Sequence, residues 1–209
     1  MAVKAFIFDL DGTLLDTSVD LACGINRMRK FYGLSELPVE TVISYLGDGA
    51  LQLTERSLKD SDISPEKAVS VFLDYYEENI CVATDFYPGM REFISELNKR
   101  GISAGILTNK PQHPTDKLIE ALGIGHMFDF IYGPDLFGKK PDPNGLIQCL
   151  KEINVDASEA FMVGDHHTDL FAANDAGVEN IFVHYGFGRI GDSRADNEIT
   201  TADELFKFL

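Results

Sequence analysis

The sequence predicts an α/β fold, in which helices cover both faces of an open parallel sheet and an all-helical cap domain is inserted near the N-terminus. Short apolar runs alternate with helical patterns from residue 85 onwards, as in a parallel sheet that is buried on both faces. Residues 16–84 carry helical patterns but no run that resembles a buried strand. We therefore expect a core domain of residues 1–15 and 85–209 and a helical cap domain of residues 16–84.

The first expected strand is a run of large apolar residues over 3–8, which ends abruptly at an acidic residue. Residues 16–18 offer N-caps for a helix that should end near residue 33, which is a glycine. Three more helices are expected within the cap domain, over residues 38–45, 50–58 and 65–82.

The core domain should continue with strands over residues 102–108, 128–132, 160–163 and 180–183. Helices are expected between and after them, over residues 88–100, 114–122, 143–153, 169–176 and 202–209. Gly101, Gly123 and Gly177 follow three of these helices, and a glycine just past the last turn is a common helix end.

Composition limits the classes of partner. The chain of 209 residues has a formal net charge of -16, so its general field would repel nucleic acid and anionic membranes. An anionic substrate would need a local cation, either a metal ion or particular Lys and Arg residues. No apolar run approaches the ~18 residues that span a bilayer, and no signal-type start is recognised. The three cysteines form no CxxC pair, so we expect reduced thiols and a cytoplasmic protein.

Two carboxylates follow the first strand. Asp9 and Asp11 flank Leu10, and side chains two positions apart on an extended segment lie on the same face. Two converging negative charges repel each other unless a proton or a cation lies between them. The pair therefore suggests a reactive or metal-binding site, although an Asp-Gly turn after a strand is the simpler alternative.

Other strand ends carry polar residues as well. In a Rossmann-like open sheet, working residues gather where the parallel strands end. Thr108 and Asn109 follow the second core strand, Lys140 lies on the loop after the third, and Asp165 and Asp169 follow the fourth. Each alone could be a turn, a surface charge or a helix cap. Together they offer the oxygen ligands that Mg²⁺ prefers and the donors that phosphoryl transfer requires.

These motifs, in this order, resemble the phosphatases of the haloacid dehalogenase superfamily. The resemblance covers nearly the whole chain and is strongest to the phosphoglycolate phosphatase branch, in which helical caps follow the first motif. Further stretches that carry it are Asp11–Leu21, Leu46–Ala50, Tyr87–Gly89, Thr108–Pro111 and Tyr185-Gly186.

The resemblance implies a role for each motif residue. Asp9 would be the nucleophile that accepts the phosphoryl group, and Asp11 would protonate the leaving group and then activate water. Mg²⁺ would be held by Asp9, by the backbone carbonyl region of Leu10 or Asp11, and by Asp165. Asp169 would support the metal site from nearby. The residues that would hold the phosphoryl oxygens are Thr108, Asn109 and Lys140, whereas the neighbouring Lys139 fits a surface lysine equally well.

The cap domain would read the far end of a small phosphorylated metabolite, with phosphoglycolate as the first candidate. The candidate residues are Gly47, Asp48, Gly49 and Arg56. Asp48 is unexpected there, because its carboxylate would repel the carboxylate of phosphoglycolate. We expect a monomer or a homodimer.

Two patterns point elsewhere. His166 and His167 follow Asp165, where the family usually has Ser or Thr, and a histidine pair suggests a transition metal; a supporting role or solvent exposure is the simpler interpretation. Residues 186–191 match GxGxxG after a strand, but a polar stretch follows them instead of the helix that dinucleotide binding needs. We interpret them as a loop.

Two other functions remain open. A sugar phosphomutase shares the fold and the nucleophile, but it would return the phosphoryl group to a sugar. A non-catalytic binding protein should have lost a motif residue, and none is lost here. The substrate could also be another phosphorylated metabolite or pyrophosphate.

Overall fold

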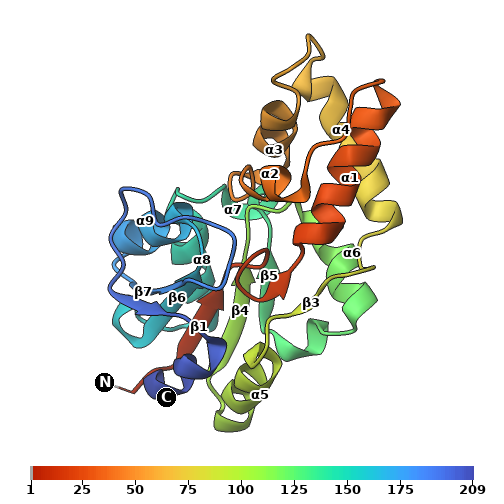
Figure 1. The fold of residues 1–209 in the computed structure, drawn as a ribbon. Helices are drawn as coiled ribbons and strands as arrows, with labels where there is room; N and C mark the ends of the chain where they lie inside the picture. The colour runs from red at the N-terminus through yellow and green to blue at the C-terminus, as the bar shows by residue number, and fades with distance from the viewer. Residues whose placement is uncertain (1) are drawn as a thin grey trace.

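The computed structural model describes residues 2–209 and contains a six-stranded parallel sheet (Figure 1). The strand order is β5-β4-β1-β6-β7-β8, and every neighbouring pair is parallel. The strands are β1 (Ala5–Phe8), β4 (Ser103–Leu107), β5 (Phe130–Tyr132), β6 (Ala160–Gly164), β7 (Glu179–Val183) and β8 (Asn197–Ile199). The predicted α/β class with an open parallel sheet is confirmed.

The central strand β1 divides its side chains between two cores. Phe6 and Phe8 are fully buried in one apolar cluster, whereas Ala5 and Ile7 are fully buried in the other. This alternation follows from the two-residue period of a strand. Because side chains on both faces are buried, the sequence of such a strand is apolar at every position.

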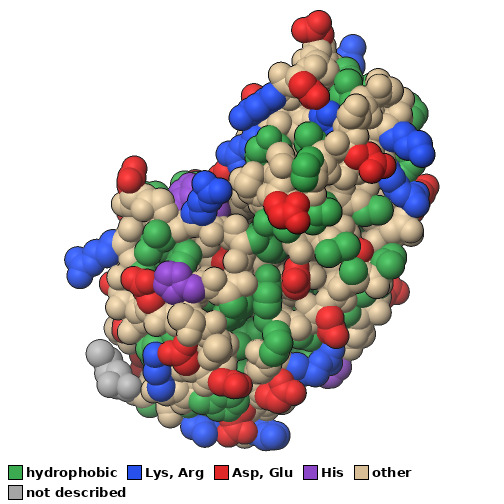
Figure 2. Space-filling view, viewed as in Figure 1, with side chains coloured by type: hydrophobic (Ala, Val, Ile, Leu, Met, Phe, Trp, Pro, Cys, Tyr) green, Lys and Arg blue, Asp and Glu red, His purple; other side chains and the backbone are tan. Residues whose placement is uncertain are grey.

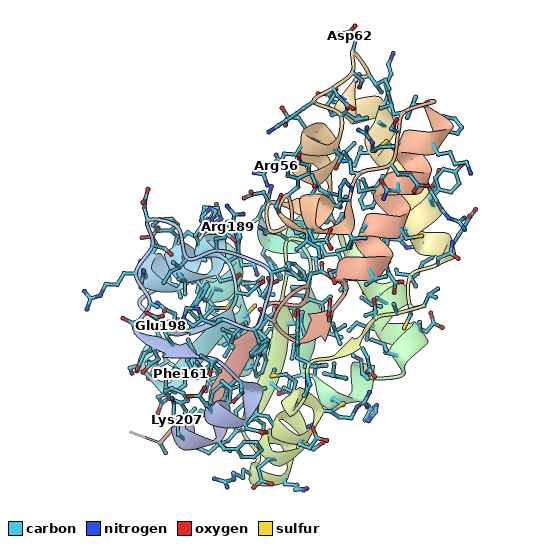
Figure 3. The ribbon with its side chains drawn as sticks, viewed as in Figure 1. Arg56, Asp62, Phe161, Arg189, Glu198 and Lys207 are labelled. Atoms are coloured by element: carbon cyan, nitrogen blue, oxygen red, sulfur yellow. The ribbon has the colours of Figure 1, made fainter. Side chains whose placement is uncertain are left out.

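Helices cover both faces of the sheet. On the Phe6 side pack α5 (Met90–Arg100), α6 (Gln112–Leu122) and the 3-10 helix η3 (Ala202–Phe208), with the Phe93 ring 5.2 Å from that of Phe6. Phe161 on β6 meets η3 on this face, with its ring 5.3 Å from that of Phe208 (Figure 3). On the other face, α8 (Asn144–Ile153) and α9 (His167–Ala176) contribute to the Ile7 cluster.

Four helices lie between residues 16 and 85 in the chain and stand together above the sheet (Figure 1). They are α1 (Ser18–Phe31), α2 (Val39–Ile43), α3 (Gly49–Ser57) and α4 (Pro65–Glu78). Two short strands that pair antiparallel, β2 (Leu15–Asp16) and β3 (Asp85–Phe86), lead into and out of this helical group. The bounds of α1, α2 and α3 lie within about two residues of the predicted ones. The division into two domains at residues 16 and 84 stays a prediction.

Some predicted elements differ from the structure. The fourth helix ends at Glu78 instead of residue 82, and the backbone N–H groups of Val82, Ala83 and Thr84 donate to the carboxylate of Asp20. The final helix is 3-10. Elements that were not predicted are β2, β3, β8, α7 (Pro134–Phe137) and the 3-10 helices η1 (Gly125–Met127) and η2 (Ala157–Glu159).

Within residues 2–209, no helix has both the length and the apolar character that crossing a membrane requires.

Candidate active site

The motif residues lie where β1, β4 and β6 end. β1 is flanked by β4 on one side and β6 on the other, so the strand order reverses here, and ligands of open α/β sheets bind at such a reversal. The backbone N–H of Asp9 continues the ladder by donating to Val163 O at 2.9 Å, which fixes the position of Asp9 directly past β1. Leu10 is fully buried, as its alternation predicts.

Asp9 and Asp169 share one ammonium group. Lys140 Nζ lies 2.9 Å from Asp9 Oδ1 and 2.6 Å from Asp169 Oδ1, and it donates to Leu107 O at 2.6 Å. The two carboxylate contacts are ion pairs, and the contact with Leu107 O is a hydrogen bond. Lys140 is buried, so it acts as a fixed cation inside the site.

A third carboxylate, that of Asp165, completes a buried acidic group. Oxygen atoms of Asp9, Asp165 and Asp169 all lie within 4.8 Å of one another. Asp165 Oδ2 accepts hydrogen bonds from the backbone N–H groups of Phe187, at 3.0 Å, and Gly188, at 2.7 Å. We did not predict these two donors, because nearly every residue type has a backbone N–H and the sequence does not mark the ones that form such contacts.

The acidic group carries more negative charge than its surroundings offset. Burial raises the pKa of Asp9 to about 6 against the effect of Lys140, with Asp169 adding to the rise. Burial also raises the pKa of Asp165, and Asp9 and Asp169 raise it further. Three carboxylates face one ammonium, so a divalent cation would balance the excess. The ligand atoms are carboxylate oxygens, which fit a hard cation such as Mg²⁺.

Two loops can approach this group only because they carry glycine. Gly12 has φ +89°, and a Cβ there would lie 2.2 Å from Asp165 Oδ2. A Cβ on Gly186 would lie 2.4 Å from Asp165 Cβ. Gly186 and Gly188 of the GxGxxG pattern therefore allow close approach to Asp165, and the stretch is a loop, as predicted.

Asp11 does not join the acidic group. Its two carboxylate oxygens lie 3.0 and 3.2 Å from Lys110 Nζ, and this ammonium lies 4.5 Å from the centre of the Tyr76 ring on α4. Asp9 and Asp11 do line one cavity, together with Lys110 and Tyr76. Sequence reasoning missed Lys110 and Tyr76 as site residues. The only signal for Lys110 is its place two positions after Thr108.

Thr108 and Asn109 also line this cavity. Thr108 Oγ1 accepts from the N–H of Lys110 at 3.1 Å. Asn109 Nδ2 donates to Lys140 O at 3.0 Å, and its Oδ1 is buried without a hydrogen-bond partner among the described residues. Both residues are therefore placed beside Asp9 as expected, and their role toward phosphoryl oxygens stays a prediction.

The residues predicted to read the substrate's far end fall into two sets. Gly47 and Gly49 line the cavity, whereas Asp48 and Arg56 are not among its lining residues. Arg56 donates to Asp48 and to Tyr45 O. Burial opposes the charge of Asp48, but the hydrogen bond from Arg56 and the attraction of His166, Arg56 and His167 together outweigh burial and lower the pKa of Asp48. The expected repulsion by Asp48 is thus offset within the loop.

A notch in the surface separates the helical group from the sheet (Figure 2). Figure 3 labels Arg56 on the helical side and Arg189, on the loop after β7, on the sheet side. His166 and His167 lie near this boundary, with ligand atoms within 4.8 Å of one another and of Asp48. His166 is buried, and its Nδ1 lies 2.9 Å from Thr168 Oγ1. Burial and the neighbouring His167 lower the pKa of His166 to about 4.

Comparisons with known proteins agree with this geometry. A family model described as haloacid dehalogenase-like hydrolase matches residues 6–183. A phosphoglycolate phosphatase of Pseudomonas fluorescens is 38% identical over 192 residues, which cover 88% of this chain and 70% of the relative. One of Nitrosospira multiformis is 38% identical over 194 residues, 90% of this chain and 86% of the relative.

Solved structures also resemble the chain. The crystal structure of a predicted phosphoglycolate phosphatase from Haemophilus somnus superposes with a TM-score of 0.92 at 28% identity and covers 99% of this chain and 98% of that one.

Proposed function

The chain belongs to the haloacid dehalogenase-like hydrolase family, and on that premise we propose that it is a Mg²⁺-dependent phosphatase of small phosphate monoesters. The reaction would pass through a phosphoryl group bound covalently to Asp9. Phosphoglycolate is the first candidate substrate, because several relatives carry the name phosphoglycolate phosphatase.

One observation carries this proposal. The carboxylate of Asp9 lies at the wall of a cavity, and Lys140 holds its Oδ1 at 2.9 Å. A carboxylate that is fixed by a buried cation and open to a cavity can attack an entering ester without reorganising first. A structural ion pair would have no reason to face a cavity beside Thr108 and Asn109.

The first step would form a bond from an Asp9 oxygen to phosphorus while the bond from phosphorus to the ester oxygen breaks. Asp11 would give a proton to the departing oxygen, and it would then take a proton from the water that releases phosphate. One carboxyl group can serve both halves because the first half leaves it deprotonated and the second half returns its proton. Asp9 and Asp11 line the same cavity, which supports this division of work.

Mg²⁺ would be held by the carboxylates of Asp9 and Asp165, with Asp169 beside them in the same group. The family resemblance implies the backbone carbonyl region of Leu10 or Asp11 as a further ligand. When bound, the ion would lower the repulsion between Asp9 and the phosphate dianion. The loop glycines and the N–H groups of Phe187 and Gly188 would keep Asp165 in place for this purpose.

We propose that helices α1–α4 act as the cap over this cavity, because Tyr76 of α4 and Gly49 of α3 contribute to its wall. The three free cysteines support our expectation of a cytoplasmic enzyme.

The test is phosphate release from a panel of esters, with phosphoglycolate, sugar phosphates and pyrophosphate, in Mg²⁺ and in EDTA. We expect turnover with Mg²⁺, none in EDTA, and a loss of about 10⁴-fold or more in Asp9→Asn, whose amide cannot form an acyl phosphate. Circular dichroism should show an unchanged fold in the variant.

Near-normal turnover by Asp9→Asn would contradict the mechanism. Rescue by Zn²⁺ but not by Mg²⁺ would assign the metal to the histidines instead. Activity that depends on a sugar bisphosphate and releases little phosphate would identify a phosphomutase.

A further inference from the structure

The wall of the cavity beside Asp9 carries a cation, Lys110, that the proposed phosphatase reaction does not use. We propose that Lys110 and Tyr76 form a subsite for a carboxylate carried by the substrate, so that the enzyme acts on small phosphate esters of hydroxy acids. This inference rests on the proposed function, because it places the phosphoryl group of the same molecule at Asp9.

Lys110 is a charged donor at the wall of the cavity. Its side chain is 4% exposed. Burial works against the charge of Lys110, but Asp11 and Tyr76 together outweigh burial and hold the pKa of the ammonium above its usual value. Asp11 contacts Nζ at 3.0 and 3.2 Å, and an ammonium has three N–H bonds, so a second carboxylate can bind beside Asp11 or in its place.

Tyr76 supplies a second donor at the same place. The centre of its ring lies 4.5 Å from Lys110 Nζ, its hydroxyl oxygen interacts with that ammonium, and its buried O–H has no acceptor among the described residues. A buried O–H without an acceptor costs free energy, and an acceptor from a ligand would remove that cost. A phenol and an ammonium side by side both donate, so the group that satisfies them is an acceptor with negative charge.

The neighbouring cations are engaged elsewhere. Lys140 contacts Asp9, Asp169 and Leu107 O, as described above. Lys139 Nζ donates to Asp48 O and, at 3.0 Å, to Gln52 Oε1, and Arg56 donates to Asp48. Within residues 2–209, Lys110 is the one cation among the residues that line the cavity. In a chain with a net charge of -16, a substrate carboxylate requires such a partner.

The cavity also limits the size of the substrate. Leu21, Leu46, Leu53 and Phe72 supply apolar wall between the polar residues. In a short acid with a phosphate at one end and a carboxylate at the other, the phosphate would lie at Asp9 and the carboxylate at Lys110 and Tyr76. Only a short carbon chain would then remain to contact the apolar wall.

The experiment compares two phosphonates that cannot be hydrolysed. 3-Phosphonopropanoate ends in a carboxylate, and 3-hydroxypropylphosphonate ends in an alcohol at the same place. Binding is measured by titration calorimetry in Mg²⁺. We expect wild type to bind 3-phosphonopropanoate at least about 30-fold more tightly than the alcohol, because a hydrogen bond to a charged group contributes a factor of about this size. In Lys110→Met, the ratio of the two affinities should fall to about 1. Tyr76→Phe, which removes one atom, should reduce the ratio about 3-fold or more.

Lys117→Met is the matched control, because Lys117 is exposed on α6 and contacts Glu77 at 2.6 Å. It should keep the wild-type ratio. A wild-type ratio near 1, or a ratio that survives in Lys110→Met, would overturn the subsite. An equal weakening of both ligands in Lys110→Met would instead give Lys110 a purely structural role. Because binding is measured without turnover, a missing phosphatase activity would contradict the proposed function and leave this comparison intact.

Discussion

The ammonium of Lys140 and the carboxylate of Asp169 form an ion pair of 2.6 Å between two side chains that solvent hardly reaches, with exposures of 2% and 0%. Removing one partner of such a pair leaves an uncompensated buried charge, which costs more than the pair itself contributes. Here the loss of Lys140 would leave three neighbouring carboxylates without their cation.

We therefore expect Lys140→Met to lower the free energy of unfolding of the metal-free protein by about 3–5 kcal/mol. Urea denaturation in EDTA measures this loss. Mg²⁺ should restore part of it, because a divalent cation balances the carboxylates. The double variant Lys140→Met/Asp169→Asn should be more stable than Lys140→Met alone, and the opposite order would contradict this account.

Stability in EDTA should depend on pH through Asp9. The folded-state pKa of about 6 lies above the ordinary Asp value of ~3.9, so the native state binds this proton more tightly than the unfolded state does. The contribution of Asp9 to stability is greatest below pH ~4 and is lost as the pH rises to ~6, by up to about 3 kcal/mol.

Asp9→Asn isolates this effect, because it cannot titrate. The difference in unfolding free energy between wild type and Asp9→Asn, measured with urea in EDTA, should change across this pH window and be flat above pH ~7. Saturating Mg²⁺ should remove most of this pH-dependent change in the unfolding free energy difference. Parallel curves for the two proteins would show that Asp9 is not perturbed.

Gly12→Ala should damage the acidic group directly. The added Cβ would lie 2.2 Å from Asp165 Oδ2, so Asp165 must move, and a displacement of about 1 Å at a reacting centre can cost about 10²-fold in rate. Gly33→Ala is the control: Gly33 also has a positive φ, +73°, but no atom lies within 4 Å of its Cβ position.

Both alanines store backbone strain of about 1–3 kcal/mol, and only Gly12→Ala meets a neighbour. We expect weaker Mg²⁺ activation and a loss of activity of about 10²-fold for Gly12→Ala, against unchanged kinetics for Gly33→Ala. Equal activities of Gly12→Ala and Gly33→Ala would indicate that the Asp165 side chain can move without loss of function, against this prediction.

The sequence was most informative where an element is long or ends with a distinctive residue. Gly101, Gly123 and Gly177 do end their helices with positive φ values of 69°, 66° and 71°. By contrast, β8 has three residues, Asn-Glu-Ile, and α7 has four, which is too few to show a period. Their formation depends on partners, such as β7 for β8, which are distant in the chain.

The site could be predicted where it follows from topology. Parallel strands bring their carboxyl ends to one edge, so Asp9, Lys140, Asp165 and Asp169 were expected together, and they are. The pairing of Lys110 with Tyr76 could not be predicted, because Tyr76 lies on a helix whose position over the sheet no local pattern encodes. The same reasoning that brought Asp9 and Asp11 to one face gave no hint that each would contact a different lysine.

Asp20 should be the main link between helix α1 and the segment that returns to the sheet. Its buried carboxylate accepts from the N–H groups of Val82, Ala83 and Thr84 and from Thr84 Oγ1 at 2.7 Å. Hydrogen bonds to a charged group contribute about 1.5–3 kcal/mol, so Asp20→Asn should lower the free energy of unfolding by about that amount. Asp74→Asn, on the exposed side of α4, should change it by no more than about 0.5 kcal/mol. Urea denaturation at pH 7 compares the two, and similar losses would mean that the charge of Asp20 contributes nothing to this connection.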